Sequence, residues 1–287
     1  MIKLYYKIKL AMNIITSIAE MKKISKDLKE SSRQISFIPT MGKLHDGHLK
    51  LIEEGKKYGE VIVSIFVNPA QFGHDEDFEN YPRDFENDVK ILKDLNIGYL
   101  FHPQADIIKN TATFLINPEY ANRLEGVFRP THFQGVLTIV MKLFCIINPD
   151  FAFFGLKDYQ QYILIKKMVE DYFLDVRVIP VPTVREKCGL AMSSRNAYLD
   201  EKDKKIACNF YGSLKKTTDL FKAGEISGEK LTVSAIKELI KSGFKIDYIK
   251  IMDQGLNTEK RTVDSGDILL AAAKFKGVRL IDNIFFE

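Results

Sequence analysis

The sequence predicts an α/β protein in which a doubly wound, Rossmann-like parallel sheet is followed by a smaller α+β domain. Short apolar segments alternate with helical segments as far as Pro180 and Pro182, which is typical of a parallel sheet with helices on both faces. Beyond these prolines the order changes to two long polar helices and then three strands. We therefore expect a first domain over residues 1–183 and a C-terminal lid domain over residues 184–287.

The elements of the first domain follow from apolar runs and from helical spacing. Strands are predicted at Ile35–Ile38, Val61–Val67, Tyr99–Phe101, Phe151–Phe154 and Asp175–Ile179. Val61–Val67 is apolar enough to lie inside a parallel sheet. Helices are predicted at His48–Tyr58, Asp84–Leu95, Gln134–Ile147 and Asp158–Asp171. In the second domain the same patterns predict helices at Asp200–Lys222 and Gly228–Ser242, and strands at Asp247–Met252, Ile268–Lys274 and Val278–Asp282.

Length and composition exclude several classes of protein. The chain has 287 residues, of which 46% are hydrophobic and 28% charged. This is the balance of a globular protein of about two domains and not of a disordered or fibrous chain. The apolar runs are too short to span a membrane. A net charge of +4, spread along the chain, does not predict a nucleic-acid partner. Lysines interrupt residues 1–11, so we expect an extra strand or an extension there and no signal peptide.

The cysteines are few and widely spaced. Cys145, Cys188 and Cys208 form neither the even set of a disulfide framework nor the paired spacing of a zinc site. A reducing cytoplasm is therefore the expected compartment. We expect Cys145 in the core, because it lies within a strongly apolar helix, and Cys208 in a polar helix without a partner.

The first chemical motif is the segment Phe37–Leu49, FIPTMGKLHDGHL, which runs from a strand through a turn into a helix. A helix N-terminus exposes unpaired N–H groups and favours anions. His45 and His48 are three residues apart at this helix start, so both can donate hydrogen bonds to phosphate oxygens as charge builds up during transfer. The pair could also bind a metal or lie on the surface. However, no carboxylate or cysteine completes a familiar ligand set, and a strand end favours a nucleotide.

The stretch Pro39–His48 resembles the signature of the pantothenate synthetase family. It also resembles the wider HxGH nucleotidylyltransferase group, which is related to class I aminoacyl-tRNA synthetases. Phe66–Gly73, FVNPAQFG, favours the first, because Asn68 and Gln71 suit the hydroxyl and carboxylate groups of a small acid. Asn-Pro is also a common turn signal. The resemblance places the segment Arg129–Val136 beside the same pocket, although its histidine could equally belong to a helix cap.

Two later segments add charge for a polyphosphate. Phe154–Gln161, FGLKDYQQ, resembles the Gly-x-Lys-Asp loop that binds ATP in the family, and its last glutamine is the one that holds pantoate there. Lys157 is placed to neutralise a phosphate, and Asp158 is a candidate N-cap. The x of this Gly-x-Lys-Asp motif is usually glutamate in the family. It is Leu156 here, so a backbone contact would survive and a carboxylate contact would not.

The second segment that adds charge for a polyphosphate is Val184–Asn196, VREKCGLAMSSRN. Its Met-Ser-Ser-Arg loop offers two hydroxyls and a guanidinium to a triphosphate, and it resembles the mobile Lys-Met-Ser-Lys-Ser loop of class I synthetases. The guanidinium of Arg195 can bind phosphate oxygens bidentately and balance charge as pyrophosphate leaves. Cys188 replaces a residue that is often small or acidic in the family. It is a tolerated loop change or a reactive thiol near the site.

The resemblance implies ATP-dependent ligation of pantoate and β-alanine through a pantoyl adenylate, with release of AMP and pyrophosphate. It implies catalytic roles for His45, His48, Lys157 and Arg195. It implies ATP contacts from Met41, Gly42, Lys43, Leu44, His45, Asp46, Gly47, His48, Gly155, Leu156, Lys157, Asp158, Val184, Met192, Ser193, Ser194 and Arg195. It implies contacts to pantoate or β-alanine from Asn68, Gln71 and Gln161.

The implied partners are the three substrates, with no nucleic acid and no membrane. Mg²⁺ is expected to arrive with ATP, held by phosphate oxygens and water and not by protein ligands. A cytoplasmic homodimer is what the resemblance suggests. The alternatives are another HxGH nucleotidylyltransferase that acts on a different small acid or phosphate, and a non-catalytic nucleotide- or RNA-binding protein. The intact histidines, lysine and arginine argue against the last.

Overall fold

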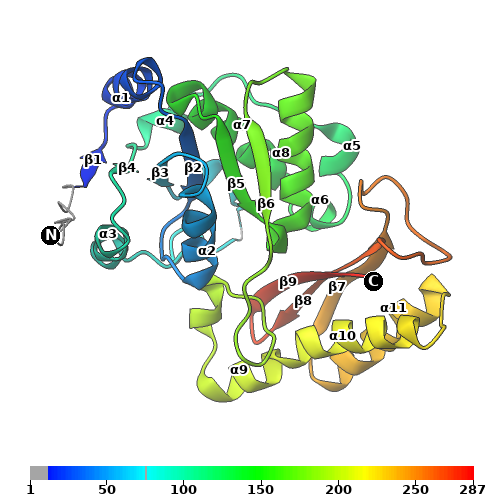
Figure 1. The fold of residues 1–287 in the computed structure, drawn as a ribbon. Helices are drawn as coiled ribbons and strands as arrows, with labels where there is room; N and C mark the ends of the chain where they lie inside the picture. The colour runs from blue at the N-terminus through cyan, green and yellow to red at the C-terminus, as the bar shows by residue number, and fades with distance from the viewer. Residues whose placement is uncertain (1–11, 75) are drawn as a thin grey trace, which may run out of the picture.

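The computed structural model describes residues 12–74 and 76–287, so the expected extension at residues 1–11 lies outside the described part. The chain forms a six-stranded parallel sheet in the order β1-β4-β3-β2-β5-β6 and a separate three-stranded sheet (Figure 1). The strands of the large sheet are β1 (Asn13–Ile15), β2 (Ile35–Thr40), β3 (Glu60–Ile65), β4 (Tyr99–Phe101), β5 (Phe151–Gly155) and β6 (Arg177–Val181). The predicted fold class is confirmed.

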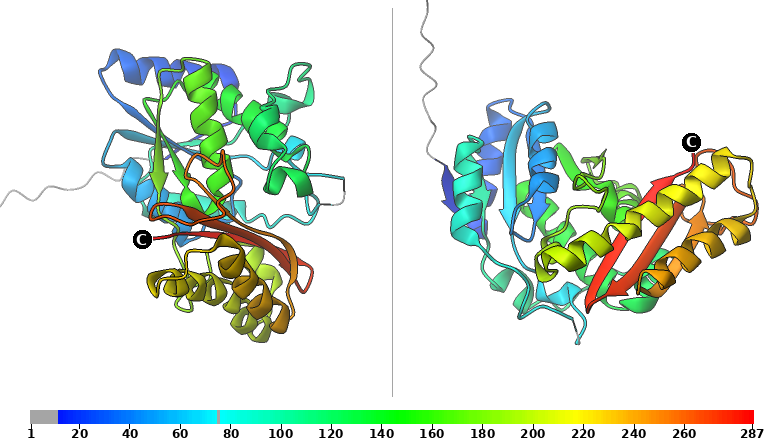
Figure 2. Two further views of the ribbon diagram at one scale, coloured as in Figure 1. Left: turned by 90° about the vertical axis from the view of Figure 1, so that its right-hand side faces the viewer. Right: turned by 90° about the horizontal axis from the view of Figure 1, so that it is seen from below.

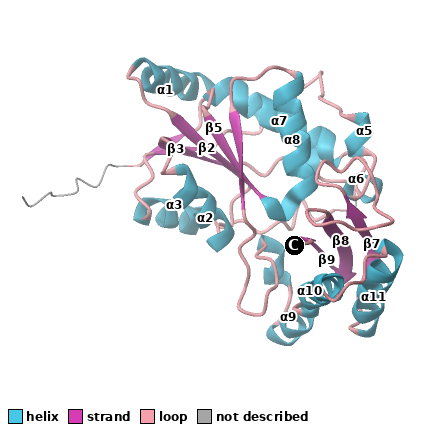
Figure 3. Cartoon of the chain, turned by 45° about the vertical axis from the view of Figure 1, so that its right-hand side comes forward, coloured by secondary structure: helices cyan, strands magenta, loops and turns pink. Residues whose placement is uncertain are grey.

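Helices cover both faces of this sheet. Its long helices are α1 (Ile18–Glu30), α2 (Asp46–Gly55), α3 (Phe85–Asp94), α7 (His132–Ile147) and α8 (Tyr159–Asp171), and its short ones are α4 (Asp106–Lys109), α5 (Pro118–Ala121) and α6 (Glu125–Phe128). Because side chains alternate along a strand, Phe37 of β2 packs among residues of α1, α7 and α8. Its neighbour Ile38 packs among residues of α2 and α3. Figure 3 shows α2 and α3 on one side of the strands and α7 and α8 on the other.

The first helix was not predicted, although the sequence carries its signals. The Ser17 hydroxyl accepts the Glu20 N–H at 3.4 Å as an N-cap. Met21, Ser25 and Leu28 are buried at the four- and three-residue spacing of one helix face. Strand β1, only three residues long, leaves two of its residues exposed and gives no comparable pattern. The two elements add an edge strand and a covering helix without changing the fold class.

A crevice opens where the strand order reverses. Strand β2 pairs with β3 along its whole length, but it pairs with β5 only through Ser36 and Phe37. Beyond these residues β2 and β5 separate. The strand was expected to end before Pro39, yet it continues to Thr40, because Pro39 faces no ladder on the β5 side and its missing N–H leaves nothing unpaired there. Ligands of doubly wound sheets bind at such a reversal, beyond the carboxyl ends of the strands.

The C-terminal part is a three-stranded antiparallel sheet with helices on one face. Its strands are β7 (Lys245–Met252), β8 (Ile268–Phe275) and β9 (Val278–Phe285), and its helices are α9 (Glu201–Ala207), α10 (Asn209–Lys222) and α11 (Gly228–Lys241). The single helix expected over Asp200–Lys222 is interrupted at Cys208. Figure 2 shows α10 and α11 along the sheet. There Leu214 and Leu231 pack in one cluster with Ala271 of β8.

Buried ion pairs join the two parts of the chain. Arg279 of β9 donates to both oxygens of Glu125 of α6 and to Asp247 of β7 at 2.7 Å. The Tyr248 hydroxyl donates to Glu125 at 2.9 Å, and Glu125 is only 6% exposed. A buried carboxylate is stable when its lone pairs are satisfied in this way. Among the described residues, no helix is long and apolar enough to cross a membrane.

The expectation that Cys145 lies in the core is wrong. Its thiol is free and exposed, whereas Leu143, Phe144, Ile146 and Ile147 on the same helix are buried. Helix α7 turns 100° per residue, so one position among these apolar neighbours faces outward. Residue type alone did not show which position that was.

Candidate active site

A cavity of about 230 Å³ lies at the carboxyl ends of β2 and β5. It brings together most of the predicted site residues: Met41, His45, Gly47, His48, Asn68, Gln71, Gly155, Lys157, Asp158, Gln161, Val184, Met192, Ser193, Ser194 and Arg195. Gly42, Lys43, Leu44, Asp46 and Leu156 do not line it. A second cavity of about 570 Å³ adjoins it between the two sheets, and Arg129, Lys157, Asp158, Ser193 and Arg195 line both.

The two histidines hold each other at the start of α2. His45 is the N-cap: its Nδ1 accepts the Gly47 N–H at 3.1 Å, and its own N–H is donated to His48 Nδ1 at 3.3 Å. The ring centroids are 4.1 Å apart. Because each Nδ1 acts as an acceptor, each neutral ring carries its proton on Nε2. The pair therefore presents two N–H donors to a ligand in the cavity.

Burial and charge keep these rings neutral. Desolvation lowers the pKa of His48 to about 3, with further lowering by His45 and Lys157. Desolvation, followed by the Lys157 ammonium, lowers the pKa of His45 to about 4. Lys157 and Arg195 bring positive charge to the cavity, while the neutral imidazoles can supply hydrogen bonds.

Neutral amide side chains line part of the cavity near α7. Asn68 Nδ2 donates to Gln71 Oε1 at 3.2 Å and to the Gly135 carbonyl at 3.1 Å, so Asn68 fixes Gln71. The side chain of Gln71, 8% exposed, donates to Met41 Sδ at 3.0 Å. Gln161 lines the same cavity from α8. Two amides of this kind can bind hydroxyl and carboxylate oxygens without adding charge.

The loop after β5 presents Lys157. Its ammonium is 3.5 Å from Asp158 Oδ1, and its side chain is 21% exposed. Asn283 of β9 donates to the carbonyls of Leu156 and Lys157 at 2.8 and 3.1 Å, so the C-terminal sheet holds this loop by its backbone. The side chain of Leu156 packs against the core. The side chain of Leu156 therefore adds no polar group to the cavity.

The loop Val184–Asn196 brings Arg195 over the cavity. Arg195 donates from Nε and from one terminal nitrogen to the two oxygens of Asp77, at 2.9 and 2.7 Å. Desolvation lowers its pKa but Asp77 outweighs this, so the pKa of Arg195 is raised overall. The hydroxyl of Ser194 donates to the Lys43 carbonyl at 3.3 Å. The loop thus meets the histidine-bearing turn directly.

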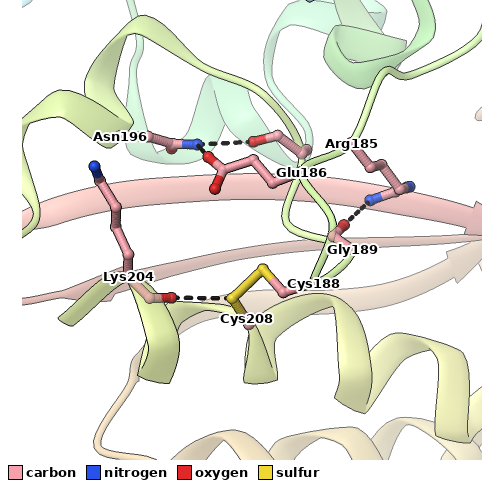
Figure 4. Close-up of a disulfide and its surroundings, with 8 residues drawn as sticks. Arg185, Glu186, Cys188, Gly189, Asn196, Lys204 and Cys208 are labelled. Atoms are coloured by element: carbon pink, nitrogen blue, oxygen red, sulfur yellow. Dashed lines mark hydrogen bonds between the residues drawn. A yellow bond between two sulfur atoms is a disulfide. The ribbon is translucent and has the colours of Figure 1, made fainter. Parts of the chain in front are cut away.

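A disulfide between Cys188 and Cys208 anchors the same loop (Figure 4). This corrects the expectation that the cysteines form no disulfide and that Cys208 has no partner. The two Cα atoms are 5.7 Å apart. A hairpin, marked by the bridge between Arg185 and Ala191, places Cys188 at its tip against the break between α9 and α10. Neither the hairpin nor the break was evident from the spacing of the cysteines. Cys188 is therefore not a free thiol.

The comparisons with known proteins agree on one family. The family model for pantoate-β-alanine ligase matches residues 13–285. The chain belongs to the pantoate–β-alanine ligase family. The pantothenate synthetase of Fervidobacterium nodosum is 42% identical over 280 residues, which are 96% of this chain and 100% of that protein. The fold matches the crystal structure of pantothenate synthetase from Thermus thermophilus with a TM-score of 0.89 and 35% identity, covering 95% and 99% of the two chains.

A further ligase of this family has been solved with substrates. The pantoate-β-alanine ligase of Francisella tularensis, described as complexed with β,γ-ATP and β-alanine, matches with a TM-score of 0.81 and 37% identity. The match covers 96% of this chain and 98% of that one. Family membership and the fold therefore rest on nearly the whole chain and not on the short histidine motif alone.

Several residues of this ligase-family cavity were not predicted as site residues. Tyr81, Arg129 and His132 line it. His132 Nδ1 bonds the Gln71 carbonyl at 2.9 Å, and Arg129 is paired with Glu76. Asp77, the partner of Arg195, was also missed. Their segments were noted, but no local pattern indicates which polar side chain of a loop folds back over a distant strand end.

Proposed function

We propose that the residues gathered in this cavity carry out the family reaction, the ATP-dependent ligation of pantoate and β-alanine to pantothenate. A pantoate carboxylate oxygen attacks the α-phosphorus of ATP, the α–β phosphoanhydride bond breaks, and pyrophosphate leaves. The amine of β-alanine then attacks the acyl carbon of the adenylate, loses a proton, and displaces AMP. The observation that carries the proposal is the convergence of two neutral imidazoles, a lysine and an arginine around one cavity beside two amides.

The roles follow from charge. The Nε2–H groups of His45 and His48 donate to oxygens of the phosphate at which substitution occurs, and their hydrogen bonds strengthen as negative charge builds up. Lys157 and Arg195 balance the charge of the departing pyrophosphate. Gln71 and Gln161 orient pantoate, and Asn68 holds Gln71 in place. No protein nucleophile is required, because the adenylate itself supplies a good leaving group.

The apolar wall of the cavity suits the carbon skeleton of pantoate. Val136, Ile139, Val140 and Leu143 line the cavity from α7. Pantoate carries two methyl groups on one carbon together with two hydroxyls and a carboxylate. An apolar wall opposite a pair of amides matches this division.

Mg²⁺ enters with ATP as part of the substrate. The described residues contain no group of three or more His, Cys, Asp or Glu side chains arranged to hold a metal ion. Mg²⁺ that travels with ATP is bound chiefly by phosphate oxygens and water. Asp158, whose side chain is 45% exposed beside Lys157, is a carboxylate that lines the cavity. We place the domain boundary at Thr183, just after β6. We assign the enzyme to the cytoplasm as a homodimer on the family resemblance alone, because the disulfide removes the argument that the cysteines gave for a reducing compartment.

The test is a pyrophosphate-release assay against a panel of small carboxylic acids. ATP and pantoate together should release pyrophosphate, and adding β-alanine should yield AMP and pantothenate in equal amounts. Omitting pantoate is the control. If pyrophosphate release does not depend on pantoate, or if no amide forms, the substrate assignment is wrong.

A further inference from the structure

Asp88 is a buried carboxylate to which the reaction assigns no part. It lies on α3, which does not line the cavity, and it is 1% exposed. One oxygen accepts the Lys43 N–H at 2.8 Å and the other accepts the Leu44 N–H at 2.7 Å. A carboxylate that accepts two backbone amides makes stronger hydrogen bonds than a neutral acceptor would. Desolvation nevertheless raises its pKa.

The turn that Asp88 holds has an unusual backbone. Gly42 and Lys43 are both left-handed, with φ of +79° and +51°. At Gly42 a Cβ would lie 3.0 Å from Asp88 Oδ2 and would be strained by the positive φ, so glycine suits this position. At Lys43 the left-handed conformation is unfavourable for a residue with a side chain. This turn persists because outside contacts hold it, and the two hydrogen bonds to Asp88 are such contacts.

The same turn sets the position of the catalytic groups. It ends at His45, the N-cap of α2, whose ring and backbone fix His48. Its Lys43 carbonyl accepts the hydroxyl of Ser194, so the loop that carries Arg195 also rests on it. The amides of Lys43 and Leu44 are bonded to Asp88, and neither residue lines the cavity.

We propose that Asp88 is a positioning residue of the ATP site: by holding the amides of Lys43 and Leu44, its carboxylate fixes the turn that aims His45 and His48 at the phosphate. The effect on the reaction depends on the proposed function. The effect on the turn depends only on the two hydrogen bonds to Asp88. Asp88 does not line the cavity and its carboxylate bonds two backbone amides, so it acts through the backbone. A change at Asp88 should therefore alter the rate of adenylate formation without altering the site for pantoate.

The experiment compares Asp88→Asn and Asp88→Glu with the wild-type enzyme in the pantoate-dependent release of pyrophosphate. Asparagine keeps one acceptor and turns an amide NH₂ toward the other N–H, so kcat should fall about 10- to 100-fold. Glutamate keeps both acceptors on a longer stem and should retain more activity than asparagine, with kcat about fivefold below wild type. KM for pantoate should change less than about twofold in both variants.

Asp84→Asn is the matched control. Asp84 lies at the start of the same helix and pairs with the Lys43 ammonium at 3.1 Å, with both side chains more than a third exposed. This variant removes a contact to the side chain of Lys43 and leaves the backbone contacts intact. Its kcat should stay within about twofold of wild type.

Several outcomes would overturn the positioning role. One is a wild-type kcat in Asp88→Asn. Another is a loss of activity that only follows the unfolded fraction seen in a melting curve. If Asp88→Asn does not fold, a wild-type kcat in Asp88→Glu decides against the proposal. Should the wild type release no pyrophosphate with pantoate, the proposed function fails separately. In that case the positioning of the turn is tested by ATP affinity, measured by calorimetry. ATP should bind more weakly to Asp88→Glu than to the wild type if Asp88 positions the turn.

Discussion

The two halves of the nucleotide site are held in different ways. The turn from Met41 to His48 is fixed by backbone hydrogen bonds, by the mutual cap of two histidines and by a buried carboxylate. The loop Val184–Asn196 is fixed by side chains: Arg195 pairs with Asp77, each about a quarter exposed, and a disulfide ties the loop to the smaller domain. The first half carries neutral donors and the second half carries charge.

The difference follows from what each half must do. Groups that stabilise charge developing at one phosphorus atom need a fixed geometry, and a turn at the edge of a parallel sheet supplies it. Groups that accept a flexible triphosphate and then release pyrophosphate must exchange partners. An ion pair on a loop, with each side chain about a quarter exposed, can do so. In this chain Asp77 accepts from two nitrogens of the Arg195 guanidinium.

The largest expected effect concerns the rigid half. Replacing His48 with alanine should lower kcat by about 10²- to 10³-fold, because one fixed donor to the transition state is lost. His48→Gln is the matched variant, since its amide N–H can reach near the position of the imidazole Nε2–H, and it should lose less. Pyrophosphate release measures both. Melting temperatures within a few degrees of wild type should show that folding is intact, and near-normal turnover in His48→Ala would remove the proposed role.

The sequence predicted the rigid half better than the adjustable one. The strand, turn and helix around His45 are local, and apolar runs with glycines and histidines at fixed spacing indicate them directly. The contacts of the adjustable half are not local: 118 residues separate Arg195 from Asp77, and Cys188 meets Cys208 only after a hairpin forms. Asp88 was missed for the same reason, because 44 residues separate it from Leu44. Long-range pairing depends on packing that a single sequence does not display.

An intermediate effect concerns the disulfide of the adjustable half. Reducing it, or replacing Cys208 with serine, should lower the free energy of unfolding by about 3 kcal/mol, because the bond closes a loop of some 20 residues in the unfolded chain. Denaturant titration with and without dithiothreitol measures this. Cys145→Ser is the control and should leave stability unchanged, since that thiol is free and exposed.

Activity should respond much less to that change. The loop keeps other contacts when the disulfide is reduced, including the pair between Arg185 and the buried Asp282 at 2.6 Å. The Asn196 amide also donates to Glu186 at 2.8 Å. We expect kcat to stay within about twofold of the oxidised enzyme. Equal unfolding free energies in oxidised and reduced protein would contradict the structural role of the bond.

The smallest expected effect is that of pH on the histidine pair. With pKa values lowered to about 3 and about 4, His48 and His45 stay neutral from about pH 5.5 to 8, where an unperturbed histidine would titrate. The first step should be measured without β-alanine, because the ionisation of its amine would change the rate. The ratio of wild-type to His48→Gln rates cancels the ionisation of ATP and should vary less than about twofold over this range. A fall in the ratio centred near pH 6.5 would show that His48 titrates normally.

The same lowered pKa values set the sign of the stability change. The unfolded chain takes up protons on these histidines below about pH 6.5, while the folded chain does so only near their lowered values. Stability should therefore be fully present above pH 6.5 and decline as the pH falls toward 4. Catalysis measured per folded molecule should stay level over the upper part of that range. If the histidines are neutral and buried, lowering the pH should reduce the free energy of unfolding before it reduces kcat. If they titrated normally, the free energy of unfolding and kcat would fall over the same pH range.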